Sequence, residues 1–137
     1  MYNIPENTIH YINKIIVEEK HLDQLLHVNN IVYLQWVNDI SEKHWALLAG
    51  KTLMKKYFWV VLKHELEYLS QAVLHDEITI VTYIGESHGV KSVRHVDMYK
   101  GETRLLRAAS TWCLIDATTL KPSRIKNDIL DLLIPGD

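Results

Sequence analysis

Residues 23–36 hold the side chains best suited to chemistry in this sequence. A carboxylate, Asp23, stands four positions before His27, and two side-chain amides, Asn29 and Asn30, follow where a polar segment becomes apolar. The start of a helix presents unpaired backbone N–H groups and the positive end of the helix dipole, so it can stabilise a developing negative charge. An acid or base just upstream would act beside such an oxyanion site. This combination favours acyl-transfer or hydrolytic chemistry over a plain binding surface.

Each of these side chains also has a purely structural interpretation. Asp23 by itself is typical of a loop or capping acid, but its place beside His27 and Asn30 favours a catalytic role. His27 could be a structural histidine bonded to backbone, or it could serve as an acid or base near neutral pH. Asn30 either caps the helix or holds a water molecule or a substrate carbonyl. Tyr33 and Trp36 either pack in the core or line a substrate pocket.

The helix that positions these residues can be predicted from caps and periodicity. β-Branched residues predict a first strand over residues 8–18, and a polar loop follows it. Asn29 and Asn30 stand at N-cap positions, so we predict a helix from there to about residue 49, with Gly50 as its C-terminal stop. Its polar positions fall on one narrow stripe, formed by Gln35, Asp39, Glu42 and Ala46. Because the rest of the helix is apolar, we expect it to be enclosed on several sides.

After Gly50 the apolar pattern changes from the period of a helix to that of strands. Four further strands are predicted, over residues 57–69, 77–85, 90–99 and 104–115. The short turns at residues 85–89 and 100–102 indicate antiparallel hairpins, and the tail over residues 121–133 adds a short helical turn. We therefore predict an α+β fold in which one long central helix is wrapped by a curved five-stranded antiparallel sheet.

The composition predicts a soluble cytoplasmic protein. The 137 residues, of which 47% are hydrophobic and 23% charged, contain no repeat or linker, so one domain is expected over residues 1–137. The net charge of −2 gives no case for a nucleic-acid or membrane partner. Cys113 is the only cysteine, which excludes an internal disulfide and favours a reducing compartment. The polar N-terminus and the lack of a span-length apolar run argue against secretion and membrane insertion.

No metal or cofactor is expected from the motifs. None of the eight histidines forms a pair with metal-ligand spacing, and no Gly-rich phosphate loop or dinucleotide fingerprint occurs. Cys113 lies within a predicted strand between Trp112 and Leu114, as is typical of an inert buried thiol. Some basic residues of the last strands and the tail could meet an anionic ligand, namely members of the set Lys91, Arg94, Arg104, Arg107, Lys121 and Arg124.

The sequence Asp23-Gln-Leu-Leu-His-Val-Asn-Asn-Ile-Val-Tyr33-Leu-Gln-Trp36 resembles the active-site signature of hotdog-fold thioesterases. It is similar both to the 4-hydroxybenzoyl-CoA thioesterase type and to the acyl-ACP thioesterases, in which an Asp-containing loop leads into His-Val-Asn-Asn-x-x-Tyr. The likeness extends to the later strands, over residues 65–69, 76–80 and 108–125. It implies a hotdog fold, which agrees with the architecture predicted above.

The resemblance also implies roles for individual residues. Asp23 stands at the position of the catalytic aspartate, and Asn30 stands where some bacterial relatives place a catalytic histidine. His27, Asn29 and Tyr33 match the signature directly. The chain departs from many CoA-type members at the position before His27, where Leu26 replaces a glycine, and this predicts a different path for the loop.

The implied activity is hydrolysis of an acyl thioester, acyl-CoA or acyl-ACP, to a carboxylic acid and a thiol. Asp23 would be the general base or the nucleophile, and backbone N–H groups near Asn30 and Ile31 would stabilise the oxyanion. His27 and Asn30 would orient the water or the carbonyl. Substrate binding is expected from Asn29, Ile31, Tyr33 and Trp36.

The resemblance further implies a homodimer or a dimer of dimers (a homotetramer), because family members place the substrate between protomers. An uncovered outer strand in a small sheet supports the same expectation. Two alternatives stay open: a non-catalytic acyl-CoA-binding domain on the same fold, and a helix-plus-sheet cone with a steroid or polyketide pocket. The acyl group and the carrier are not determined by the sequence.

Overall fold

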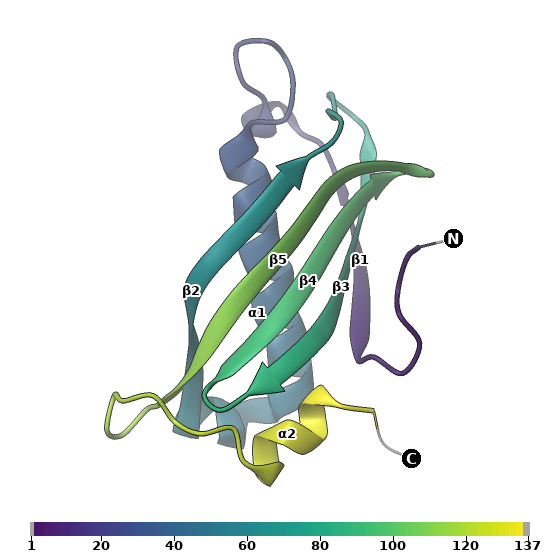
Figure 1. Ribbon diagram of the computed structural model, residues 1–137. Helices are drawn as coiled ribbons and strands as arrows, with labels where there is room; N and C mark the ends of the chain where they lie inside the picture. The colour runs from purple at the N-terminus through teal and green to yellow at the C-terminus, as the bar shows by residue number, and fades with distance from the viewer. Residues whose placement is uncertain (1, 136–137) are drawn as a thin grey trace.

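The computed structural model describes residues 2–135. Along the chain, a strand and a short 3₁₀ helix precede one long helix, and four strands and a short C-terminal helix follow it (Figure 1). The elements are β1 (His10–Ile16), η1 (Glu19–His21), α1 (Asn30–Lys56), β2 (Tyr57–Tyr68), β3 (Glu77–His88), β4 (Lys91–Lys100), β5 (Thr103–Asp116) and α2 (Asn127–Leu133). Apart from η1, which was not predicted, this order is the predicted one, including the short helix in the tail.

All five strands form one antiparallel sheet in the order β1-β3-β4-β5-β2. The sheet curves along α1, which lies against one of its faces, and α2 lies across the end of the sheet at which α1 finishes (Figure 1). Strands β1 and β2 are therefore the two edges. The arrangement confirms the predicted α+β class and the hotdog fold, in which a curved sheet wraps a long helix.

Helix α1 begins where its cap predicts and is interrupted at the predicted stop. The Asn29 side-chain Oδ1 accepts the N–H of Ile31 at 3.0 Å, which is an N-cap hydrogen bond. Gly50 has φ 74° and ψ 173°, a conformation reserved for glycine, but the chain then returns to helix as far as Lys56. The expected enclosure was wrong in extent, since Ile31 and Leu47 are exposed: the sheet covers one side of the helix only.

The hairpin between β3 and β4 is tighter than predicted. Strand β3 continues to His88, and the turn consists of Gly89 and Val90 instead of residues 85–89. Ser87 pairs with Ser92 in the ladder, and their hydroxyl groups are 2.9 Å apart. This pairing extends the strand through polar residues that, in the sequence alone, resemble a loop.

The core consists of two hydrophobic clusters separated by a buried polar layer. One cluster surrounds the first half of α1, including Tyr33 and Trp36, and the other surrounds Trp45 near its second half. Between them lie polar residues that are at most 7% exposed, contributed by α1 and by three strands: Ser41, His44, Thr82, Arg94 and Ser110. Cys113 is buried, as predicted. No helix within residues 2–135 has both the length and the apolar character needed to cross a membrane.

Candidate active site

The loop before α1 is a closed, hydrogen-bonded turn that projects beyond the end of the sheet (Figure 1). Leu22 and Val28 form an antiparallel bridge at its base. Above this bridge the Asp23 N–H donates to the His27 carbonyl at 2.8 Å, and the Leu26 N–H donates to the Asp23 carbonyl at 3.1 Å. The backbone therefore holds Asp23 and His27 side by side.

Leu26 itself adopts the left-handed backbone conformation, with φ 64°. That conformation favours glycine, because a Cβ atom is strained there. Leu26 thus supports a left-handed turn at the position where many CoA-type thioesterases have glycine. The Leu26 side chain is 67% exposed, so it points into solvent from this turn.

The Asp23 carboxylate is oriented by the loop that contains it. Its Oδ1 atom accepts the backbone N–H groups of Leu25 at 2.8 Å and of His27 at 3.2 Å. Oδ2 has no hydrogen-bond partner among the described residues. The capping role foreseen for Asp23 is thus real, and it uses one carboxylate oxygen while the other stays available.

The first turn of α1 offers one backbone donor. The Ile31 N–H is taken by the Asn29 side chain, and the Val32 N–H donates to the Asn29 carbonyl at 2.9 Å. The Asn30 N–H has no acceptor among residues 2–135. An oxyanion at this helix start could accept a hydrogen bond from the Asn30 N–H. The Ile31 N–H could donate to it only after its hydrogen bond to the Asn29 side chain is broken.

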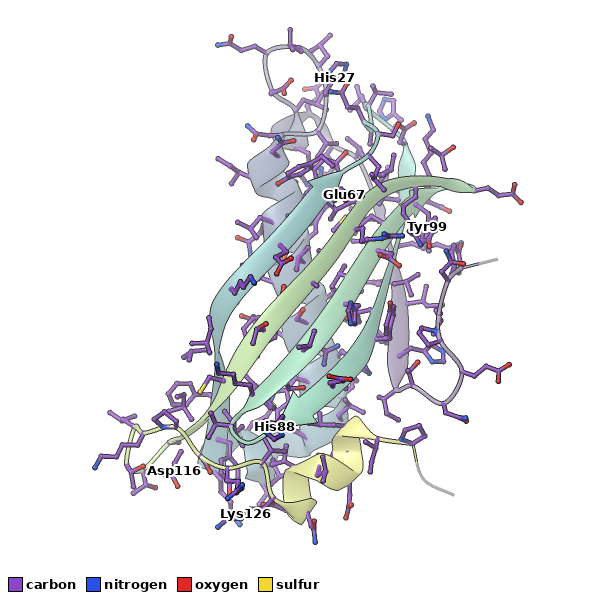
Figure 2. All side chains as sticks on the ribbon, viewed as in Figure 1. His27, Glu67, His88, Tyr99, Asp116 and Lys126 are labelled. Atoms are coloured by element: carbon purple, nitrogen blue, oxygen red, sulfur yellow. The ribbon has the colours of Figure 1, made fainter. Side chains whose placement is uncertain are left out.

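An open depression of about 590 Å³ lies beside this helix start. His27, Asn30 and Tyr33 form one side of it, and Figure 2 shows His27 at this end of the molecule, far from His88 at the other. The opposite side comes from the end of β2 and the segment after it: Tyr68, Leu69, Ser70, Gln71 and Val73. The structure therefore brings together three of the seven predicted site residues.

The other predicted residues lie near the depression without lining it. Asp23 does not line the depression but accepts a hydrogen bond from the backbone N–H of His27, which does. The Asn29 side chain caps the helix. Ile31 is 74% exposed and is not among the residues that line the depression. Trp36 is 5% exposed and packs edge-on against Tyr33 at 5.7 Å between ring centroids, so the packing interpretation is the one that its position supports.

Hydrogen bonds to the segment after β2 hold the two walls together. The Val28 N–H donates to the Ala72 carbonyl at 3.0 Å, and the Ala72 N–H donates to the Tyr33 hydroxyl at 3.2 Å. The Tyr68 hydroxyl donates to the Asn30 carbonyl at 3.3 Å. Burial raises the pKa of Tyr33, which keeps the phenol neutral and suits it to positioning instead of proton transfer.

One side-chain atom of this site is both buried and unused. The Nδ1 atom of His27 is enclosed and has no hydrogen-bond partner among the described residues. A buried polar atom without a partner is costly, so it marks a place where a water molecule or substrate group would be stabilised. Within residues 2–135 no group of three or more His, Cys, Asp or Glu side chains could hold a metal ion.

Sequence reasoning missed the wall formed by Tyr68–Val73. The strand that precedes it was predicted, but nothing in its local pattern says that its end returns to the loop of His27. The bridge between His27 and Val73 joins residues 46 positions apart, and it depends on the register of the sheet. The polar pair Ser70 and Gln71 directly after the strand is the one signal that could have drawn attention to it.

A known protein family matches this chain over most of its length. The family described as the acyl-ACP thioesterase N-terminal domain matches residues 10–133, which is most of the chain. A search of curated protein sequences found no match.

Solved structures share the fold at low sequence identity. YbaW, a probable thioesterase from Escherichia coli, is 23% identical, with a TM-score of 0.76 over 90% of this chain and 98% of that one. SAV2348 from Staphylococcus aureus, solved in complex with CoA, is 16% identical, with a TM-score of 0.82 over 95% and 85%. An acyl-ACP thioesterase from Bacteroides thetaiotaomicron is 16% identical, with a TM-score of 0.80 over 93% of this chain and 54% of that longer chain.

Proposed function

The chain belongs to the acyl-ACP thioesterase family, and we propose that it hydrolyses its acyl thioester with Asp23 as the reacting carboxylate. Thioester hydrolysis follows from the family; the residue roles and the substrate are the proposal. The observation that carries it is the loop geometry: the backbone N–H groups of Leu25 and His27 orient Oδ1 of Asp23 and leave Oδ2 available next to His27.

Two routes are compatible with one carboxylate at this position. As a general base, Asp23 would accept a proton from a water molecule while the water oxygen attacks the thioester carbonyl. As a nucleophile, it would attack the carbonyl itself and form a mixed anhydride that water then cleaves. In both routes the C–S bond breaks, the thiolate takes up a proton, and the products are a carboxylic acid and a thiol.

The negative charge that develops on the carbonyl oxygen would be stabilised at the start of α1. The Asn30 N–H is available there, and the helix dipole adds a partial positive charge. The Asn30 amide and the His27 imidazole line the same depression, so they are placed to orient the water or the carbonyl. Tyr33 would hold the wall of the site through Ala72.

The substrate proposed is an acyl group carried by CoA or by acyl-carrier protein. The family name supports the protein carrier, and the CoA bound in the similar structure of SAV2348 supports CoA. Both carriers present the acyl group on the same type of thiol, so the reaction at the carbonyl is the same.

We propose a homodimer in which β2 pairs with its copy. This edge strand carries a run of apolar residues that are 37–53% exposed, namely Phe58, Val60, Val61 and Leu62. Its outer backbone groups face no strand of the same chain, and such an edge attracts another strand. Antiparallel pairing about the middle of β2 would set Tyr57 opposite the partner subunit's Tyr68. Sedimentation as a monomer at micromolar concentration would contradict this interface; sedimentation also separates a dimer from a dimer of dimers.

The test of the catalytic proposal is Asp23→Asn, assayed for thiol release from a panel of acyl-CoA thioesters. Asparagine keeps the Oδ1 acceptor for the two loop N–H groups, so the loop should stay folded, while the base or nucleophile is lost. We expect kcat to fall by about 10²-fold or more. The matched control is Asp39→Asn, which removes an exposed carboxylate from the outer stripe of α1 and should leave kcat unchanged.

An unchanged kcat in folded Asp23→Asn protein would exclude Asp23 from the reaction. Thermal stabilisation of the wild-type chain by acyl-CoA without thiol release would instead indicate the non-catalytic binding domain that the sequence left open.

A further inference from the structure

The central strand β4 carries a buried cation without a counter-charge. Arg94 is 7% exposed, and no carboxylate of the described residues lies within ion-pair distance of it. Its hydrogen bonds to described residues all run from Nη1, to His44 Nδ1 at 2.7 Å and to Thr82 Oγ1 at 3.1 Å. Both partners are neutral acceptors: burial and the guanidinium lower the pKa of His44 to about 4. The positive charge of Arg94 is therefore not neutralised by the described part of the chain.

Arg94 lines a cavity of about 270 Å³ between the second half of α1 and the sheet. Five aromatic residues from α1, β2 and β5 also line it, together with residues of β3 and α2; the aromatic residues are Trp45, Tyr57, Phe58, Trp59 and Trp112. The cavity exceeds the roughly 150 Å³ apolar cavity that admits benzene, so it can take a ring or a chain of several carbons.

Several hydrogen-bond donors in these walls have no acceptor among the described residues. Arg94 is a donor only, and its Nε and Nη2 atoms bond to none of the described residues. The indole N–H of Trp112 is also buried without an acceptor among residues 2–135. A buried guanidinium in an apolar wall is costly unless an anion meets it, and a carboxylate matches its paired donors.

The cavity is separated from the proposed reaction site of its own protomer. Asn30 and Glu42 are twelve residues apart on α1, or about 18 Å along the helix axis, and the first hydrophobic cluster fills the space between. The proposed β2 dimer removes this separation. Tyr57 and Phe58 line the cavity, and the pairing sets them beside the partner subunit's Tyr68, which lines the partner's depression.

We propose that this cavity receives the acyl group of the substrate and selects acyl groups that end in a carboxylate, which Arg94 binds. The identification of the ligand as the acyl group of the substrate rests on the proposed thioesterase function and on the β2 dimer. The binding of an anion in the cavity depends on neither of them, because the unneutralised guanidinium and the aromatic walls belong to one protomer.

The binding test compares octanoate with octanamide, a neutral probe of the same length, by quenching of tryptophan fluorescence. We expect octanoate to bind at least about tenfold more tightly, because a charged hydrogen-bonded pair is formed. Arg94→Gln should reduce octanoate affinity by about 10- to 100-fold and leave octanamide affinity nearly unchanged. Equal affinities for the acid and the amide in the wild-type chain would overturn the proposal.

A surface variant keeps the test valid should Arg94→Gln fail to fold. Glu42 is exposed and lines the same cavity, so its carboxylate repels an anion that enters. Glu42→Gln should therefore tighten octanoate binding by about threefold at low salt. Asp39→Asn removes the same charge from the same helix and should tighten binding less, because Asp39 does not line the cavity. An equal response of the two variants would contradict binding at this place.

A turnover measurement decides whether the anion site serves the acyl group. We expect kcat/KM to be higher for suberoyl-CoA, which ends in a carboxylate, than for octanoyl-CoA, and we expect Arg94→Gln to reverse the order. Octanoate binding at Arg94 with no preference between the thioesters would overturn the assignment to the acyl group. If neither thioester is hydrolysed, CoA as the carrier fails on its own, and the fluorescence result still decides whether the cavity binds carboxylates.

Discussion

Lowering the pH from 7 to 5 should destabilise this protein through His44. The imidazole is 3% exposed, lies against the Arg94 guanidinium at 2.7 Å, and stacks on Tyr11 at 5.5 Å between ring centroids. Burial first and Arg94 second lower its pKa from 6.5 to about 4. The folded protein thus keeps the imidazole neutral at a pH where the unfolded chain protonates it.

The sign and the size follow from proton linkage. Between pH 6.5 and pH 4 the unfolded state binds more protons at His44 than the folded state, so the free energy of unfolding falls as the pH falls. The full pKa difference corresponds to about 3 kcal/mol, and about 2 kcal/mol of it is lost between pH 7 and pH 5. Above the unfolded value of 6.5 the contribution is complete.

The assay is urea unfolding at pH 7, 6 and 5 of the wild-type chain and of His44→Gln. Glutamine can accept the Arg94 hydrogen bond but does not titrate, so the difference between the two proteins isolates His44 from every other group. The wild type should lose about 2 kcal/mol more than the variant over this range. The control His88→Gln changes an exposed histidine and should follow the wild type. Parallel losses in the wild type and His44→Gln would refute the reasoning.

Three backbone predictions can be checked by thermal and urea unfolding. Gly50→Ala should destabilise by about 1–3 kcal/mol although an added Cβ meets no atom within 4 Å, because φ 74° with ψ 173° excludes a side chain; a stabilised variant would contradict the break in α1. Leu26→Gly should be neutral or stabilising by up to about 1 kcal/mol, since it relieves the positive φ and removes an exposed side chain, whereas a large loss would mean that Leu26 packs against another subunit. Asn29→Ala should cost about 1 kcal/mol through the lost cap of Ile31, and no loss would show that the cap is dispensable.

Local signals in the sequence were sufficient for most of the fold. The cap at Asn29, the break at Gly50 and the alternation in the four later strands each depend on residues within a few positions, and the structure has all of them. Two details differed from the prediction. Helix α1 resumes after Gly50 and continues to Lys56. The β3–β4 hairpin is tighter, because the polar residues around Ser87 keep pairing across the ladder where their types suggest a loop.

The candidate site was predicted only on one side. The loop of Asp23 and His27 and the start of α1 are adjacent in sequence, so their proximity could be expected. The wall at Tyr68–Val73 could not, since it reaches His27 through the register of the sheet and the path of the chain after β2. The Asn29 cap, which the sequence predicted, takes up the Ile31 N–H and so removes one of the two donors expected for the oxyanion.

By itself the sequence determined which segments are helix and strand, where they turn, and that a carboxylate and a histidine stand before a helix start, because these features arise from contacts between near neighbours. Only the tertiary structure decided that Arg94 of β4 meets His44 of α1 and Thr82 of β3 inside the core, since residues 50 and 12 positions apart come together through sheet register and helix packing. The same long-range packing leaves the guanidinium facing an aromatic cavity instead of solvent.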